Sequence, residues 1–328
     1  MRRRDFISLL GGAAAGPLWM PLDARAQRAM PVIGYLDPTS PGVFADTGRA
    51  FRQGLKDAGF VEGENVAIVY RYAENQNARL PELASELVRR RVDVIVTFSS
   101  GAFAAKTATS TIPIVFNIAE DPVRRGLVTS LARPGGNLTG VNIVSAELVA
   151  KRLELLRELV PAANRVAVLV NPIIAQRAES ALQDARTAAS AMGLQVQVVR
   201  ASTNGEINTA YASMVRERPD VLLVTSDPFF TSRRIQLVHL ATRHAIPATY
   251  PGRPYVEAGG LMSYGADNVS AFRQIGVYAG RILNGAKPAD MPVVQADKFE
   301  LVINAETARL LGLTVSPALL ARADEVIE

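Results

Sequence analysis

The regular alternation of short apolar runs with amphipathic segments constrains the fold of this chain more than any other feature. Apolar runs lie at 31–36, 66–70, 92–96 and 112–116, and the residues between them place apolar side chains at helical spacing. Strands that read as near-continuous Val and Ile runs are covered by helices on both faces, as in parallel sheets. We therefore predict a doubly wound α/β lobe for this part of the chain.

The same pattern starts again in the second half. An apolar run at 139–143 leads into an amphipathic helix that carries leucines at helical spacing. Further strands are predicted at 165–170, 194–199, 220–225 and 246–249, with helices between them. A chain of 328 residues is long enough for two such parallel-sheet lobes, each with its own core.

The C-terminal part predicts that the chain passes between the lobes more than once. A strand is expected at 259–265, a helix at 268–283 and a strand at 299–303. Several crossings form a multi-strand hinge, and hinged lobes close on a ligand held between them. The predicted boundaries are a signal segment at 1–26, lobe 1 at 30–140 plus 265–293, and lobe 2 at 141–262 plus 296–328.

The N-terminal residues have the features of a cleaved export signal. Arg2-Arg3-Arg4 precede an apolar stretch over 6–20, and Ala24-Arg25-Ala26 supplies small residues at the usual cleavage spacing. The string R-R-x-F-I is typical of the twin-arginine (Tat) pathway, and a frayed N-terminal helix is the alternative. Because the chain contains no cysteine, we expect a periplasmic protein without a lipid anchor.

Composition and motif content argue against several classes of function. The net charge of +5 is not gathered in a basic stripe with interleaved aromatics, so nucleic acid is not an expected partner. His239 and His244 are five residues apart in a predicted helix and do not share the face that a metal pair needs. The chain has no GxSxG or HExxH motif and no glycine loop after the first strand, so we predict no catalytic group, metal or cofactor. An α/β enzyme that uses Asp121 or Asp227 stays open as an alternative.

Polar and aromatic residues follow the predicted strands, at the edge where parallel sheets bind ligands. The ligand-binding candidates of the first lobe are Asp37, Thr39, Phe98, Ser99, Ser100, Asn117 and Asp121. Those of the later strands are Asn171, Asp227, Phe229, Tyr250 and Tyr264. Each short polar residue can instead be a helix N-cap, and each aromatic residue can be ordinary packing at the sheet rim.

Two features of these candidates indicate the kind of ligand. Ser99 and Ser100 open a predicted helix, and the free N–H groups of a helix start can hold a carboxylate without a metal. The aromatic candidates favour a small, partly apolar ligand with a charged end group.

Several long strings resemble one family over essentially the whole chain. They are 31–36 (PVIGYL), 51–56 (FRQGLK), 87–96 (LVRRRVDVIV), 112–116 (IPIVF), 133–141 (RPGGNLTGV), 151–156 (KRLELL), 260–265 (GLMSYG) and 299–304 (FELVIN). Together with the export signal, they resemble the tryptophan/tyrosine-type (TrpX-like) substrate-binding proteins of ABC transporters.

The resemblance implies a type I periplasmic-binding-protein fold with three crossovers. It also implies delivery of a small solute, an amino acid or an aromatic or carboxylate-bearing molecule, to an inner-membrane permease. We expect the protein to be a monomer. An exported ligand-sensing subunit of a signalling system would share this fold and is the second alternative.

The chain departs from the family after the third predicted strand. Many relatives carry Gly-Thr-Pro before the helix, whereas this chain has Phe98-Ser99-Ser100. Ser99 keeps a hydroxyl where the family has Thr, and Phe98 in place of Gly is expected to narrow or re-line the pocket.

Overall fold

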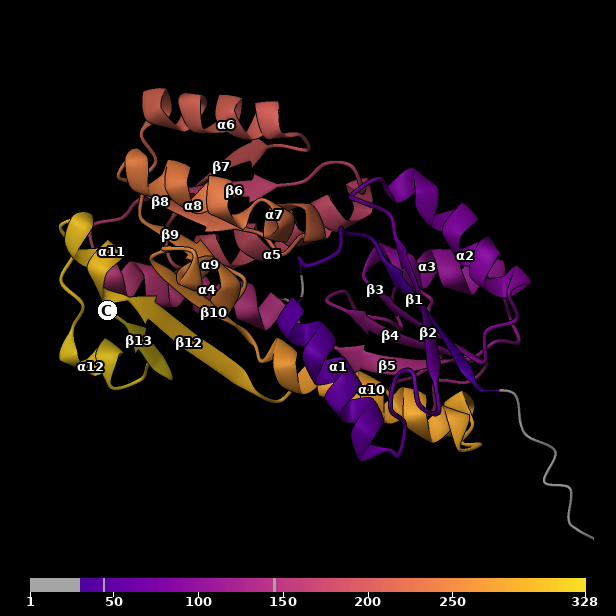
Figure 1. The fold of residues 1–328 in the computed structure, drawn as a ribbon. Helices are drawn as coiled ribbons and strands as arrows, with labels where there is room; N and C mark the ends of the chain where they lie inside the picture. The colour runs from indigo at the N-terminus through magenta and orange to yellow at the C-terminus, as the bar shows by residue number, and fades with distance from the viewer. Residues whose placement is uncertain (1–29, 44, 144–145) are drawn as a thin grey trace, which may run out of the picture. The chain divides into compact units, whose positions relative to one another are not determined.

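The central strands of the first sheet are buried along their whole length, as their Val and Ile content predicts. The computed structural model describes residues 30–43, 45–143 and 146–328, and in it β3 (Val94–Phe98) and β4 (Ile114–Ile118) are buried at every position. Among the described residues they lie inside a six-stranded sheet in the order β11-β5-β4-β3-β1-β2, with every pair parallel (Figure 1). The other strands are β1 (Val32–Asp37), β2 (Ala67–Tyr72), β5 (Leu138–Asn142) and β11 (Val294–Gln295).

Helices cover both faces of this sheet because side chains alternate between the two faces along each strand. Val94 and Val96 of β3 pack in one apolar cluster, and Ile95 between them packs in another. The first cluster includes α1 (Ala45–Asp57) and α10 (Asn268–Leu283). The second includes α2 (Leu80–Arg89) and α3 (Ser100–Ala108), and the short helix η1 (Asn77–Arg79) precedes α2.

Two glycines let α1 and α10 approach each other closely. A Cβ atom at Gly54 of α1 would overlap the carbonyl oxygen of Arg273 in α10. A Cβ atom at Gly276 of α10 would overlap the carbonyl oxygen of Phe51 in α1. The contact therefore joins two helices that are far apart in the sequence, at a spacing that only glycine allows.

The second sheet repeats the design with residues from the later part of the chain. Among the described residues it has seven strands in the order β13-β12-β10-β9-β8-β6-β7. In chain order they are β6 (Arg165–Val170), β7 (Gln195–Arg200), β8 (Val221–Val224), β9 (Ala248–Tyr250), β10 (Met262–Ala266), β12 (Phe299–Asn304) and β13 (Glu325–Ile327).

The helices of the second sheet also divide between its two faces. Val166 and Val168 of β6 pack in a cluster with α4 (Ala146–Leu159) and α5 (Ala175–Ala191). Ala167 packs in the opposite cluster, with α6 (Asn204–Glu217) and α8 (Arg234–Arg243). The shorter helices are α7 (Pro228–Ser232), α9 (Arg253–Glu257), η2 (Pro288–Asp290), α11 (Ala305–Leu310) and α12 (Pro317–Leu320).

Two strands depart from the parallel arrangement expected from the sequence, because β13 pairs parallel with β12 and both run opposite to the other strands of the second sheet. β12 pairs antiparallel with β10, and the register places Phe299, at the start of β12, beside Ala266, at the end of β10. After β10 the chain leaves for α10 and β11 of the first sheet. It then returns to the second sheet at the end where β10 finished. Because the chain re-enters the second sheet beside the carboxyl end of β10, β12 runs back along β10. A parallel β12 would have to begin at the opposite end of β10, which requires a longer crossover connection.

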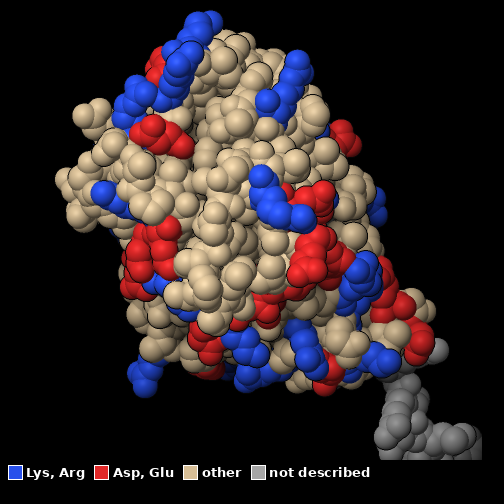
Figure 2. All heavy atoms as spheres, turned by 90° about the vertical axis from the view of Figure 1, so that its left-hand side faces the viewer, with Lys and Arg blue, Asp and Glu red and all other residues tan. Residues whose placement is uncertain are grey.

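The chain thus passes between the two sheets three times, between β5 and α4, between β10 and α10, and between β11 and β12. Pro31–Glu328 form one compact unit. The predicted signal segment at 1–26 lies outside the described residues. No helix in the described part of the chain is long and apolar enough to span a bilayer. On the face shown in Figure 2, acidic and basic side chains are interspersed.

Candidate ligand-binding site

The carboxyl ends of strands from both sheets contribute to one polar pocket. Its first-sheet residues follow β1, β2 and β3, and its second-sheet residues follow β6 and β8. The lining residues are Pro38, Asn75, Asn77, Ser100, Asn171, Ile173, Arg177, Asp227, Pro228 and Phe229. The pocket measures about 20 Å³, the room of roughly one water molecule.

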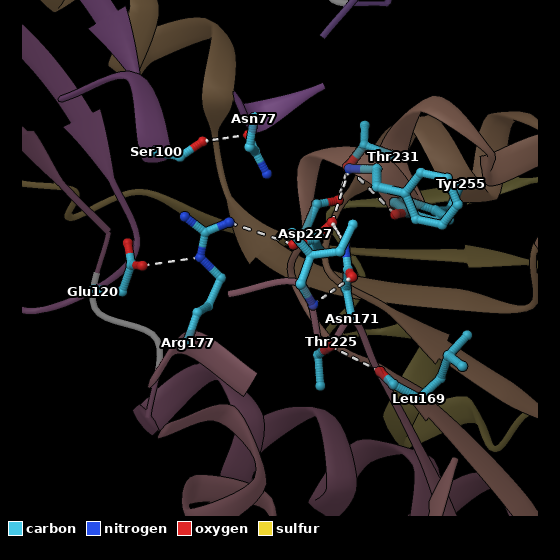
Figure 3. A network of polar contacts seen from close by, with 12 residues as sticks. Asn77, Ser100, Glu120, Leu169, Asn171, Arg177, Thr225, Asp227, Thr231 and Tyr255 are labelled. Carbon is cyan, nitrogen blue, oxygen red and sulfur yellow. Dashed lines mark hydrogen bonds and ion pairs between the residues drawn. The ribbon is translucent and has the colours of Figure 1, made fainter. Parts of the chain in front are cut away.

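Arg177, in the first turns of α5, is at the centre of the polar network (Figure 3). Its Nε lies 2.9 Å from Oε1 of Glu120, which follows β4, and its Nη1 lies 3.4 Å from Oδ2 of Asp227, which follows β8. Burial alone would lower the pKa of Arg177, but the two carboxylates together raise it above its ordinary value. The three side chains carry a net charge of −1 and link the two sheets.

Asp227 is held in place by its role as the N-cap of α7. Its Oδ1 accepts hydrogen bonds from the N–H of Phe229 at 2.9 Å and from Nδ2 of Asn171 at 3.0 Å. Asn171 in turn accepts a hydrogen bond from the N–H of Ile173. Asp227 is only 7% exposed, so its carboxylate is fixed and largely desolvated beside Arg177. Such a carboxylate suits the ammonium group of a ligand.

The start of α3 supplies one hydroxyl to the pocket, that of Ser100. Ser100 Oγ donates to Oδ1 of Asn77 at 2.9 Å. Ser99, the N-cap residue, has a φ of 50° and donates its N–H to the carbonyl oxygen of Asn117. The side-chain Oδ1 of Asn117 is buried and has no hydrogen-bond partner among the described residues. Of Ser99, Ser100 and Asn117, Ser100 alone lines the pocket, and the other two lie outside the lining. The N–H groups at the start of α3 favour an anionic group.

The other aromatic candidates pack away from this pocket. The ring of Phe98 stacks on Phe272 of α10 with centroids 4.6 Å apart, inside the α1–α10 cluster. Tyr250 stacks on Tyr255 at 5.0 Å and is 1% exposed. The ring centroids of Tyr264 and Phe299 lie 6.2 Å apart. Of the four aromatic candidates, Phe229 alone is among the residues that line the pocket.

The remaining polar candidates also lie outside the pocket lining. Asp37 and Thr39 bond to each other at the end of β1, and Asp37 lines a different cavity. Asp121 is exposed and accepts the N–H groups of Val123 and Arg124. Asp121 and Asp227 share no hydrogen-bond partner in the described part of the chain.

Four polar residues of this arrangement are not among the candidates derived from the sequence: Asn75, Asn77, Glu120 and Arg177. One feature of the sequence could have identified Arg177. A cation near a helix N-terminus opposes the helix dipole, and α5 has no acidic residue in its first turn. An unfavourably placed cation of this kind indicates partners from elsewhere in the fold.

Comparison with known proteins adds an independent finding. A family model described as "ABC transporter substrate binding protein" matches residues 41–327. A protein of Clostridioides difficile named "Tyrosine-binding protein" is 31% identical over 268 residues, which are 81% of this chain and 76% of that protein.

Two solved structures are similar over 91% of this chain and 100% of their own, each with a TM-score of 0.84. One is a conserved domain protein from Vibrio cholerae with 29% identity. The other is an ABC domain from Streptococcus pneumoniae in complex with L-Trp, with 26% identity.

Proposed function

The chain belongs to the ABC transporter substrate-binding protein family, and we propose that its solute is an amino acid with an aromatic side chain. As a member of the family, the protein captures a small solute for a membrane permease. One observation supports the amino-acid part of this proposal: Arg177 forms ion pairs with Glu120, which follows β4 of the first sheet, and with Asp227, which follows β8 of the second sheet. Arg177 and Asp227 line the pocket that Ser100, at the start of α3, also lines. That site offers separate partners for an ammonium and a carboxylate group.

We propose one binding arrangement for this ligand. Its ammonium group pairs with Asp227, and its carboxylate binds the guanidinium of Arg177 and the hydroxyls of Ser99 and Ser100. The ring of Phe229, which lines the pocket, contacts the apolar side chain of the solute. An amino acid does not fit a pocket of about 20 Å³, so binding needs movement of the lobes (30–140 plus 265–293, and 141–262 plus 296–328) about the three crossings.

The names of two relatives support the ligand class. One relative is a tyrosine-binding protein, and one similar structure holds L-Trp. Both are amino acids with an aromatic side chain, so both carry the zwitterionic group and the ring that this arrangement accommodates.

Calorimetric titration with L-tyrosine, L-tryptophan and L-phenylalanine tests the proposal. We expect Asp227→Asn to weaken binding by roughly 10- to 100-fold, because a charge-assisted hydrogen bond contributes about 1.5–3 kcal/mol. Asp121→Asn is the matched control: it also precedes a proline, it is exposed, and it should leave the affinity unchanged. Equal losses in both variants, or no binding of any aromatic amino acid to the wild type, would refute the arrangement.

We also propose where the protein acts and with what. Family members typically act outside the cytoplasm. We infer that 1–26 directs Tat-dependent export, and that the mature protein is a monomer in the periplasm without lipid anchor, catalytic activity or nucleic-acid partner. Co-purification with a permease supports this proposal, whereas co-purification with a membrane kinase would favour a sensing subunit.

A further inference from the structure

A second and larger cavity lies between α1 and the edge strand β2 of the first sheet. It measures about 290 Å³. An engineered cavity of roughly 150 Å³ already binds benzene, so this one has room for a single aromatic ring with a short chain. Its lining residues are Tyr35, Asp37, Ser40, Gly42, Ala45, Gly48, Arg49, Phe51, Arg52, Tyr70 and Tyr72.

Two small residues of α1 leave space on the helix side of the cavity, beside Arg49, Phe51 and Arg52. Ala45 and Gly48 line it, and a Cβ atom at Gly48 would meet only the Nη1 of Arg52, at 3.9 Å. A larger side chain at Gly48 therefore has space to enter the cavity without a backbone clash.

The strand side of the cavity is a wall of three tyrosines. The rings of Tyr35 and Tyr70 have centroids 5.3 Å apart, and those of Tyr70 and Tyr72 are stacked at 6.2 Å. The faces of aromatic rings carry negative partial charge and attract cations. The wall thus favours a cationic ligand with an apolar or aromatic body.

Asp37 provides a charge at the end of this wall. Its Oδ1 accepts both the N–H and the hydroxyl of Thr39 at 2.7 Å, whereas its Oδ2 accepts no hydrogen bond from any described residue. Asp37 is 3% exposed and forms no ion pair in the described part of the chain. A buried carboxylate without a cation is costly, and a ligand ammonium group would supply the missing partner.

The two arginines of the lining do not take this role. Arg49 is exposed and forms its ion pair with Asp46. Arg52 is exposed as well and lies beside the hydroxyl of Tyr70. The buried groups of the lining are therefore a carboxylate and aromatic rings, whereas both arginines of the lining are exposed.

We propose that this cavity binds a small aromatic amine, with the ammonium group on Asp37 and the ring between the tyrosines and Gly48. The proposal is independent of the function assigned to the pocket at Arg177 and Asp227. It assigns a second ligand site to the first sheet alone.

Calorimetric titration with 2-phenylethylamine tests it on the whole protein. We expect binding to the wild type that Asp37→Asn weakens by roughly 10- to 100-fold and Gly48→Leu abolishes by filling the cavity. Gly205→Leu, in a helix where a Cβ meets nothing within 4 Å, is the matched control and should bind like the wild type. 3-Phenylpropionate has the same ring with the opposite charge and should not bind at this cavity.

Two variants separate this site from the first one. Asp227→Asn should leave the affinity for 2-phenylethylamine unchanged, and Asp37→Asn should leave that for aromatic amino acids unchanged. Asn at position 37 keeps the Oδ1 acceptor for Thr39, so this variant is expected to fold even if Gly48→Leu does not. The proposal is overturned if the amine fails to bind at millimolar concentration, if Asp37→Asn binds it like the wild type, or if 3-phenylpropionate binds in an Asp37-dependent way.

Discussion

Ser99 combines a strained backbone with a position at the proposed site. Its φ of 50° and ψ of −123° lie in a region that favours glycine, and such a conformation costs on the order of 1–3 kcal/mol. Such strain persists only where the surrounding structure imposes it, and strained residues cluster at functional sites. In the proposed ligand arrangement, the function of this residue is to hold its hydroxyl at the start of α3, where it binds the carboxylate of the solute.

We therefore predict opposite effects of Ser99→Gly on stability and on binding. The variant should raise the free energy of unfolding by about 1 kcal/mol, because strain relief outweighs the added freedom of glycine. It should also weaken amino-acid binding, since the hydroxyl is lost. Urea denaturation and calorimetry measure the two effects.

Ser99→Ala is the control for this pair of effects. It removes the hydroxyl and retains the strain, so it should weaken binding without gain in stability. A Ser99→Gly protein no more stable than Ser99→Ala would show that the backbone at this position is not strained.

Asp37 predicts a pH dependence of stability. Burial raises its pKa above the ordinary 3.8, and the hydrogen bonds from Thr39 offset only part of that effect. As pH rises from 3.8 through the raised pKa, the unfolded chain releases its proton first, so this group lowers the stability of the folded state. At pH values above the raised pKa, the folded state carries the full cost of burying the charged carboxylate.

Asp37→Asn should consequently be more stable than the wild type at neutral pH. The difference in the free energy of unfolding should shrink as pH falls toward 3.8, because the wild-type carboxyl is then protonated and neutral like the amide. Denaturant titrations of both proteins across this range measure it. A difference that grows on acidification would contradict the burial of an uncompensated carboxylate.

At the scale of elements, the α1–α10 contact depends on two glycines. Gly54→Ala would push its Cβ into the carbonyl of Arg273, and backbone cannot yield as a flexible side chain does. We expect a loss of about 1–3 kcal/mol in the free energy of unfolding, typical of overpacking. Urea denaturation measures the loss.

Gly205→Ala in α6 makes the same change where a Cβ meets nothing within 4 Å. Only helix propensity then distinguishes the two residues. We therefore expect the free energy of unfolding of Gly205→Ala to exceed that of the wild type by no more than about 1 kcal/mol. If both variants behave alike, close helix approach is not what Gly54 provides.

At the scale of the whole molecule, ligand capture by both sheets links binding to global stability. A ligand that binds only the native state at roughly 100 times its Kd should add about 2.7 kcal/mol to the free energy of unfolding. Differential scanning fluorimetry should show a higher Tm with an aromatic amino acid. The shift should be much smaller for Asp227→Asn and unchanged for Asp121→Asn.

The sequence by itself determined the two α/β sheets and the position of polar residues at their strand ends. Apolar runs and helical spacing are local, and each decides which side chains must be buried. The predicted helix at 268–283 coincides with α10, and the predicted strands lie within a few residues of β1–β10 and β12. Very short strands such as β11 carry no periodic signal, so they were not predicted.

Only the tertiary structure decided which distant residues meet. Arg177 finds its partners Glu120 and Asp227 at separations of 57 and 50 residues, and Phe98 stacks on a ring from α10. The direction of β12 likewise follows from the end of β10 beside which the chain returns. Local patterns state what must be buried, but the choice of partner depends on how the sheets order their strands and where the crossings bring them together.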